Sequence, residues 1–303
     1  MTREPRLLGR SLSLSVLLLT LLGCTEPTSS WVGEPFAVTD ADLYTVVNGL
    51  AGGREGVVLI TRESGPVLLD TGLAPWTIRD IAACSATDCP DIAVGDAGAV
   101  AMGTNAAPWT TVDLGVSADL RAVTRTGDYV AVVGDETLVV WYEPEGPSSQ
   151  FSPAPPEGSW GSLRDIFAGV AVGDDGMVVV SDDMHEWRRE DPGVSVDLLA
   201  LSFFDPDPLD AEPGRLWAVG REGTVLLRGG DGTWERLDTG LESDLLAVSA
   251  GFVLTDDRRL LRIDPQGGVE FIDDYPRQPR ALWVRDAQEI LVVGDSGLYV
   301  AYH

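Results

Sequence analysis

The hydrophobic positions of the chain recur in short runs at nearly regular intervals. Seven four-residue segments begin and end on an apolar residue, and their last positions fall at 46, 81, 123, 166, 201, 248 and 282, between 34 and 47 residues apart. Short strands repeated with a period of roughly 40 residues are typical of four-stranded propeller blades. The seven segments are Leu43–Val46, Ile78–Ile81, Leu120–Val123, Leu163–Ile166, Leu198–Leu201, Leu245–Val248 and Pro279–Leu282.

A second apolar run follows most of these segments and ends in a glycine and an aspartate. Val170–Val172, for example, leads into Gly173 and Asp174. Glycine supplies the positive φ of tight turns and aspartate tolerates it, so the pattern predicts a hairpin between a second and a third strand. The repeat that begins at Leu43 fits loosely, and the sixth repeat has Thr255 in place of the glycine.

Tryptophans mark the start of the predicted fourth strand in several repeats. They precede the reference position of the following repeat by 14 or 15 residues. A large aromatic side chain suits the contact between adjoining sheets, and we interpret these residues as packing residues. The four are Trp31, Trp109, Trp187 and Trp234.

The two ends of the repeat region predict how the ring closes. The last repeat stops after its third strand, at His303, whereas Trp31–Val38 reads as a fourth strand with no blade before it. Pairing the two parts removes exposed sheet edges. The sequence therefore predicts an all-β fold: a seven-bladed β-propeller of four-stranded antiparallel blades, closed by pairing the N-terminal strand with the last three strands.

The beginning of the chain is typical of an exported bacterial protein. Three arginines precede an apolar run at residues 11–22 that is short for a membrane span, and Cys24 follows at once. Leu21–Cys24 resembles the lipobox of bacterial lipoproteins, in which the cysteine is lipidated after cleavage. The alternative is an ordinary signal peptide in which Cys24 is incidental.

This interpretation divides the chain into three parts. We expect a lipoprotein signal peptide at residues 1–23, a lipidated cysteine and short tether at 24–30, and a single propeller domain at 31–303. The mature protein is then lipid-anchored in the bacterial cell envelope. Thr25, the residue after the cysteine, favours the outer membrane according to the way in which enteric bacteria sort their lipoproteins.

The charge and the cysteines of the chain limit which partners, disulfides and metal sites can be expected. The chain has 21 basic and 48 acidic residues, and such an acidic surface is a poor partner for nucleic acid. Cys84 and Cys89 form a local pair for which an oxidising compartment predicts a disulfide. With His185 and His303 as the two histidines, the ligand set for a metal at the cysteines is thin, and we assign no metal-ligating residues and no cofactor.

Aspartates precede the first strand of four repeats at the same distance, four residues before the reference position. In a propeller this place lies beside the mouth of the central channel, so one face is expected to be acidic. We interpret it as a binding face for a cationic partner or a weakly held calcium ion. The alternative is that these carboxylates bond to nearby backbone amides. The four are Asp42, Asp119, Asp197 and Asp244.

The fifth repeat resembles a known family of repeats. Leu216–Leu227 followed by Asp231–Trp234 is similar to the BNR, or Asp-box-like, repeats of sialidase-type propellers and of the photosystem II assembly factor family. Ser181–Trp187 resembles a degenerate Asp-box. The resemblance implies a propeller, but no motif matches the catalytic residues of sialidases, and we assign no catalytic residue.

These observations favour a membrane-tethered, non-enzymatic binding or scaffold protein that offers a rigid ring of loops to a protein, peptide or glycan. We expect the ring to be monomeric. The alternative function is an exported glycan-active hydrolase of the sialidase-like type, which paired carboxylates in the channel would favour. An insertion at Phe203–Gly214 is a candidate recognition loop, with a solvated loop as the simpler interpretation.

Overall fold

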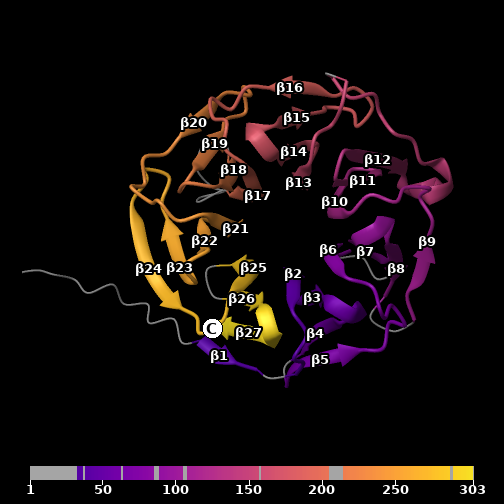
Figure 1. Cartoon of the computed structure of the whole chain (residues 1–303), viewed down its shortest axis with the longest axis horizontal. Helices are drawn as coiled ribbons and strands as arrows, with labels where there is room; N and C mark the ends of the chain where they lie inside the picture. The colour runs from indigo at the N-terminus through magenta and orange to yellow at the C-terminus, as the bar shows by residue number, and fades with distance from the viewer. Residues whose placement is uncertain are drawn as a thin grey trace, which may run out of the picture. The chain divides into compact units, whose positions relative to one another are not determined.

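Short antiparallel strands make up the regular structure of the chain, as the recurring apolar runs predict. The computed structural model describes residues 33–36, 38–62, 64–84, 89–104, 108–156, 158–204, 214–286 and 289–302. Seven sheets lie in a ring, with one strand of each facing the central axis (Figure 1). The protein is therefore a seven-bladed β-propeller, which confirms the predicted fold.

The first four blades follow one another along the chain. In each, the first strand is the innermost, and each following strand lies one place further out. Blade 1 is β2 (Leu43–Val47), β3 (Leu50–Gly53), β4 (Val58–Arg62) and β5 (Gly65–Leu69); blade 2 is β6 (Ile78–Ala82), β7 (Asp91–Gly95), β8 (Val100–Gly103) and β9 (Thr110–Val112); blade 3 is β10 (Leu120–Thr126), β11 (Tyr129–Gly134) and β12 (Thr137–Tyr142); blade 4 is β13 (Leu163–Phe167), β14 (Val170–Gly173), β15 (Val178–Val180) and β16 (Arg188–Glu190).

The last three blades continue the pattern, and the seventh closes the ring. The N-terminal strand is the outermost strand of blade 7, where Gly33 pairs with Tyr302, so the predicted closure is confirmed. Blade 5 is β17 (Leu198–Phe204), β18 (Arg215–Gly220), β19 (Val225–Arg228) and β20 (Trp234–Arg236); blade 6 is β21 (Leu245–Ser249), β22 (Phe252–Thr255), β23 (Arg259–Ile263) and β24 (Val269–Asp274); blade 7 is β25 (Pro279–Asp286), β26 (Glu289–Gly294), β27 (Leu298–Tyr302) and β1 (Gly33–Pro35).

The core lies between adjoining blades rather than at one centre. The second strand of most blades is buried on both faces, as in β11 and β14, because each face packs against a neighbouring sheet. Trp109 and Trp187 immediately precede the outermost strands and are 6% and 8% exposed, which confirms their packing role. Trp31 lies outside the described residues.

The hairpins between second and third strands follow one design, in which the two glycines have different tasks. In blade 4 a short 3-10 helix, η5 (Asp174–Gly176), makes the turn, and Asp175 and Gly176 have φ of 55° and 68°. Gly173 is extended instead, and a Cβ there would lie 2.1 Å from the carbonyl oxygen of Ser162. The leading glycine is thus required by close approach to the backbone, not by positive φ. Equivalent turns are η1 (Arg54–Gly56), η2 (Asp96–Gly98) and η6 (Asp295–Gly297).

Blade 3 departs from the predicted four strands. After β12 the chain forms two 3-10 helices, η3 (Glu143–Glu145) and η4 (Pro147–Ser149), and only Phe151 pairs with β12, at Val140. Prolines at 147, 153, 155 and 156 remove the amide donors that a ladder needs. The outer place of this blade is therefore filled by an irregular segment.

Candidate functional site: the mouth of the central channel

A β-bulge at the second residue of every innermost strand shapes one end of the channel. In β6, for example, the register shifts between Ile78 and Asp80, so Arg79 is the extra residue. A bulge re-aims a side chain, and all seven bulge residues line a central cavity of about 430 Å³. We call these seven residues the mouth: Tyr44, Arg79, Arg121, Arg164, Leu199, Leu246 and Arg280.

Each arginine of the mouth forms a two-pronged ion pair with the aspartate that begins the hairpin of its own blade. Nε and Nη2 donate to the two carboxylate oxygens, a geometry that fixes the guanidinium plane. The Nη1 atoms of these four arginines have no hydrogen-bond partner among the described residues, so donors remain for a ligand. The Nε to Oδ1 distances are 2.6 Å for Arg79 and Asp96, 2.9 Å for Arg121 and Asp135, 2.6 Å for Arg164 and Asp174, and 2.8 Å for Arg280 and Asp295.

The ion pairs in blades 3 and 7 shift the pKa values of three of their members. Its hydrogen bonds to Arg121 lower the pKa of the Asp135 carboxyl, and the same bonds raise the pKa of Arg121. The pKa of Arg280 is raised in the same way by Asp295. The side chains of the four arginines are between 27% and 43% exposed, so they remain reachable from solvent.

Blades 1 and 5 exchange the positions of the charges. Their hairpins carry Arg54 and Arg221, and these arginines pair with Asp42 at 3.1 Å and with Asp197 at 2.7 Å. The bulge residues there are accordingly uncharged, Tyr44 and Leu199. The guanidinium carbon of Arg79 lies 4.8 Å from the centre of the Tyr44 ring.

The four aspartates predicted from the sequence do lie together on the face of the mouth, and each joins two blades. Each carboxylate accepts a hydrogen bond from the residue with positive φ in the hairpin of the preceding blade. Their interpretation as ligand contacts stays a prediction. The bonds run to Asp42 from the amide of Ser296 (2.9 Å), to Asp119 from Ala97 (2.8 Å), to Asp197 from Asp175 (3.1 Å) and to Asp244 from Glu222 (3.1 Å). The backbone bond of Ser296 is the largest influence on Asp42 and lowers the pKa of its carboxyl.

Two further carboxylates lie deeper in the channel wall. Asp80 accepts hydrogen bonds from the Thr45 hydroxyl and from the amides of Ile81 and Val123. Asp165 repeats the arrangement two blades on and accepts from the amides of Ile166 at 2.7 Å and of Leu201 at 2.6 Å. Burial, with the charge of Asp80 in addition, raises the pKa of Asp165 to about 7. Both carboxylates thus link adjoining blades.

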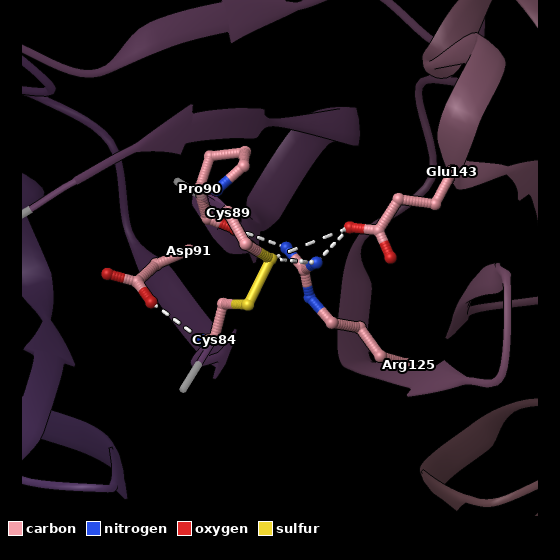
Figure 2. The surroundings of a disulfide bond; sticks show 6 residues. All are labelled: Cys84, Cys89, Pro90, Asp91, Arg125 and Glu143. Atoms are coloured by element: carbon pink, nitrogen blue, oxygen red, sulfur yellow. Dashed lines mark hydrogen bonds and ion pairs between the residues drawn. A yellow bond between two sulfur atoms is a disulfide. The ribbon is translucent and has the colours of Figure 1, made fainter. Parts of the chain in front are cut away.

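The disulfide predicted between Cys84 and Cys89 is present, in the loop between β6 and β7 at the opposite end of the channel. Figure 2 shows that the guanidinium of Arg125, from β10 of blade 3, points at this loop and contacts Cys89, the Pro90 carbonyl and Glu143. Asp91 accepts a bond from the Cys84 amide at 2.8 Å. The disulfide therefore does more than stiffen one loop, because it supports a contact between two blades.

Several predictions fall on residues that the structure does not describe. Cys24, the signal segment and the tether lie outside the described residues, as do His303 and residues 205–213 of the insertion. No helix among the described residues has the length and apolar character needed to cross a membrane. Within the same residues, no three His, Cys, Asp or Glu side chains gather in a way that could hold a metal ion.

Sequence reasoning missed the arginines of the mouth, although the signal was present. Four of the seven repeated segments carry arginine at their second position, and four of the hairpins begin with aspartate in the same blades. The ion pairs were not predicted because the search for repeats followed apolar residues. A β-bulge, in addition, is not visible in the alternation of apolar and polar positions. Comparing the repeats column by column would have exposed the covariation between the two positions.

Comparison with known proteins supports the fold and leaves the activity open. No family model and no curated protein matches the chain. It is similar to the solved structure of YCF48 bound to D1 peptide, with 14% identity, a TM-score of 0.68 and coverage of 91% of this chain and 96% of that one. It is also similar to streptogramin B lyase (9%, 0.70, 90% and 98%) and to the WD40 propeller domain of Doa1 (13%, 0.68, 89% and 95%). At these identities the likeness shows the propeller fold alone.

Proposed function

We propose that the protein is a non-enzymatic binding scaffold whose mouth holds an extended peptide segment rich in hydrogen-bond acceptors. The observation that carries the proposal is the set of unused Nη1 donors on Arg79, Arg121, Arg164 and Arg280, held in fixed orientation around a cavity. Carboxylates and backbone carbonyls are the groups that such donors recognise. The similar structure of YCF48 with a D1 peptide supports a peptide as the ligand class.

The Nη1 groups of the four mouth arginines are donors that no described residue uses, whereas most of the neighbouring carboxylates already accept hydrogen bonds. The aspartates of the four ion pairs use both oxygens on arginine, and Asp42, Asp119, Asp197 and Asp244 each accept a backbone amide. A cationic partner, the expectation from the aspartates beside the mouth, would have to compete with these internal contacts. An anionic or carbonyl-rich segment would instead use donors that are unoccupied.

The alternative, glycan hydrolysis, needs carboxylates with freedom to act as acid and base. Asp80 and Asp165 are the carboxylates that line the channel, and each accepts backbone amides on both sides of a blade junction. A structural role explains these contacts in full, and we therefore rank the hydrolase second.

We further propose that Cys24 is lipidated and tethers the ring to a bacterial membrane. Gly33, the first described residue, pairs with Tyr302 at the end of blade 7 opposite the mouth, because Tyr302 pairs with Ile290 and the mouth lies at Gly294. The first described strand, β1, therefore starts at the face of the ring opposite the mouth. Palmitate labelling that is lost in Cys24→Ala supports this proposal, and labelling that persists contradicts it.

Selection from a random library of short peptides tests the proposed function. The wild-type protein should enrich peptides with acidic side chains, and the variant with Arg79, Arg121 and Arg164 all changed to Gln should lose this enrichment. A matched variant changes Arg188, Arg215 and Arg285 to Gln, which removes the same charge from arginines outside the mouth that also pair with acids. Retention of the enrichment in the mouth variant, or its equal loss in both, would contradict the proposal.

The same selection also tests whether the mouth prefers acidic or basic peptides. A variant with Asp42, Asp119, Asp197 and Asp244 all changed to Asn should keep the acidic preference, since these carboxylates serve the blade junctions. Enrichment of basic peptides by the wild type, lost in this aspartate variant, would instead establish the acidic binding face.

A further inference from the structure

The mouth is not uniform around the ring. Going from blade 7 through blade 4, the bulge residues are Arg280, Tyr44, Arg79, Arg121 and Arg164, and the remaining two are Leu199 and Leu246 of blades 5 and 6. Blades 5 and 6 adjoin, so the two leucines form one continuous apolar sector. Both side chains are partly exposed.

The apolar sector is not a consequence of the hairpin geometry. Asp256 of blade 6 occupies the same place as the aspartates of the ion pairs, since its amide donates to the Asp244 carbonyl just as that of Asp135 donates to Asp119. Blade 6 therefore has the acid without the arginine, and the carboxylate of Asp256 has no ion-pair partner among the described residues. An arginine at position 246 would complete the pattern of blades 2, 3, 4 and 7, and the chain carries leucine there instead.

We infer that Leu199 and Leu246 form an apolar subsite that receives an aliphatic or aromatic side chain of the bound peptide. This inference rests on the proposed function, because it assigns a second specificity element to the same mouth. Ligand sites combine apolar walls with a few oriented polar groups, and here the donors lie on one arc and the leucines on the other. The ligand is then an acidic peptide with an apolar side chain beside its acceptor groups.

Changing the two leucines is expected to alter which peptides bind and to leave the fold intact. Replacing both leucines by serine removes the apolar wall and leaves the arginine pairs in place. Loss of an apolar side-chain contact of this kind weakens binding by about tenfold or more. Leu246→Arg is the complementary change, because the new guanidinium meets Asp256 in the geometry already present in the other blades.

Selection from the random peptide library described above tests the subsite. The wild type should enrich Leu, Ile, Val or Phe at one position beside the acidic residues. The double variant Leu199→Ser, Leu246→Ser should keep the acidic residues and lose that apolar position, and Leu246→Arg should add an acidic residue in its place. Urea unfolding of each variant confirms that the ring is intact.

The outcomes separate the two proposals. Acidic enrichment without an apolar position, or an apolar position that survives both leucine changes, overturns the subsite and leaves the proposed function standing. Absence of any enrichment that depends on Arg79, Arg121 and Arg164 overturns the proposed function, and the subsite with it.

Discussion

The carboxylate of Asp42 accepts a hydrogen bond from the backbone amide of Ser296, 2.9 Å away, although 254 positions separate the two residues. The bond joins blade 1 to blade 7 at the closure of the ring. Three other blade junctions repeat it with Asp119, Asp197 and Asp244. A local sequence signal, an aspartate before a strand, thus has a long-range structural task.

Asp42→Ala should lower the free energy of unfolding by about 1 kcal/mol, because the freed amide of Ser296 lies at the surface and can be hydrated. Amide hydrogen exchange of Ser296 should rise with it. Asp113→Ala is the matched control, since Asp113 accepts a hydrogen bond from the amide of Gly115 in its own loop. Equal effects of the two changes on Ser296 would contradict the role of Asp42 at the junction.

A buried tyrosine pair joins blade 6 to blade 7. The Tyr302 and Tyr275 hydroxyls are 2.6 Å apart, and Tyr302 donates to Asp273 at 2.8 Å. Tyr302→Phe should cost about 1 to 3 kcal/mol, because it leaves the buried Tyr275 hydroxyl without this partner and removes one hydrogen bond from the Asp273 carboxylate. Denaturant unfolding measures the loss, and a stability unchanged from wild type would show that these bonds do not stabilise the junction of blades 6 and 7.

Removing the disulfide should destabilise the ring without opening it. The double variant Cys84→Ser, Cys89→Ser is expected to lose about 2 kcal/mol, the value for a loop of roughly six residues. Hydrogen exchange should increase in the loop and around Glu143, which Arg125 connects to Cys89. If exchange rises evenly in all seven blades, the disulfide has a global role that its position does not explain.

Stability should depend on pH through Asp165. Burial raises its pKa from the ordinary value of 3.8 to about 7 in the folded chain, so the folded state holds a proton that the unfolded state releases. Stability therefore falls as pH rises from about 4 to 7, by roughly 3 kcal/mol. Asp165→Asn should reduce this slope, and the remainder is expected from Asp80 and Asp91, whose pKa values burial also raises. Asp183→Asn, which changes an exposed carboxyl of lowered pKa, should leave the slope in place. A wild-type unfolding midpoint that does not change over this range would contradict the assignment.

The repeats predicted the ring because alternation and turn residues act locally. All seven innermost strands begin at the predicted positions, Leu43 and Pro279 included, and the N-terminal strand closes the last blade. Blade 3 lacks its fourth strand because prolines remove the amide donors of that segment. This effect becomes clear only when the hydrogen bonds between neighbouring strands are considered. The leading glycines, such as Gly173, were expected to have positive φ. The structure shows instead that a side chain there would collide with a neighbouring carbonyl group, whose position cannot be predicted from the sequence.

The site was less accessible to sequence reasoning than the fold. The four aspartates lie beside the mouth, as expected, but they bond to backbone amides of the preceding blade, and periodicity does not predict such contacts. Arg79 and Asp96 lie 17 positions apart and meet only because a bulge turns the arginine toward the hairpin. The direction of a side chain at a bulge depends on the tertiary structure.

The crystal structure of the ring with the strongest peptide from the library selection tests the central claim most directly. The proposed function predicts a carboxylate or carbonyl oxygen of the peptide within hydrogen-bonding distance of Nη1 of Arg79, Arg121 or Arg164. A peptide bound to the outer edge of a blade, or to the face that carries the disulfide loop, would contradict it.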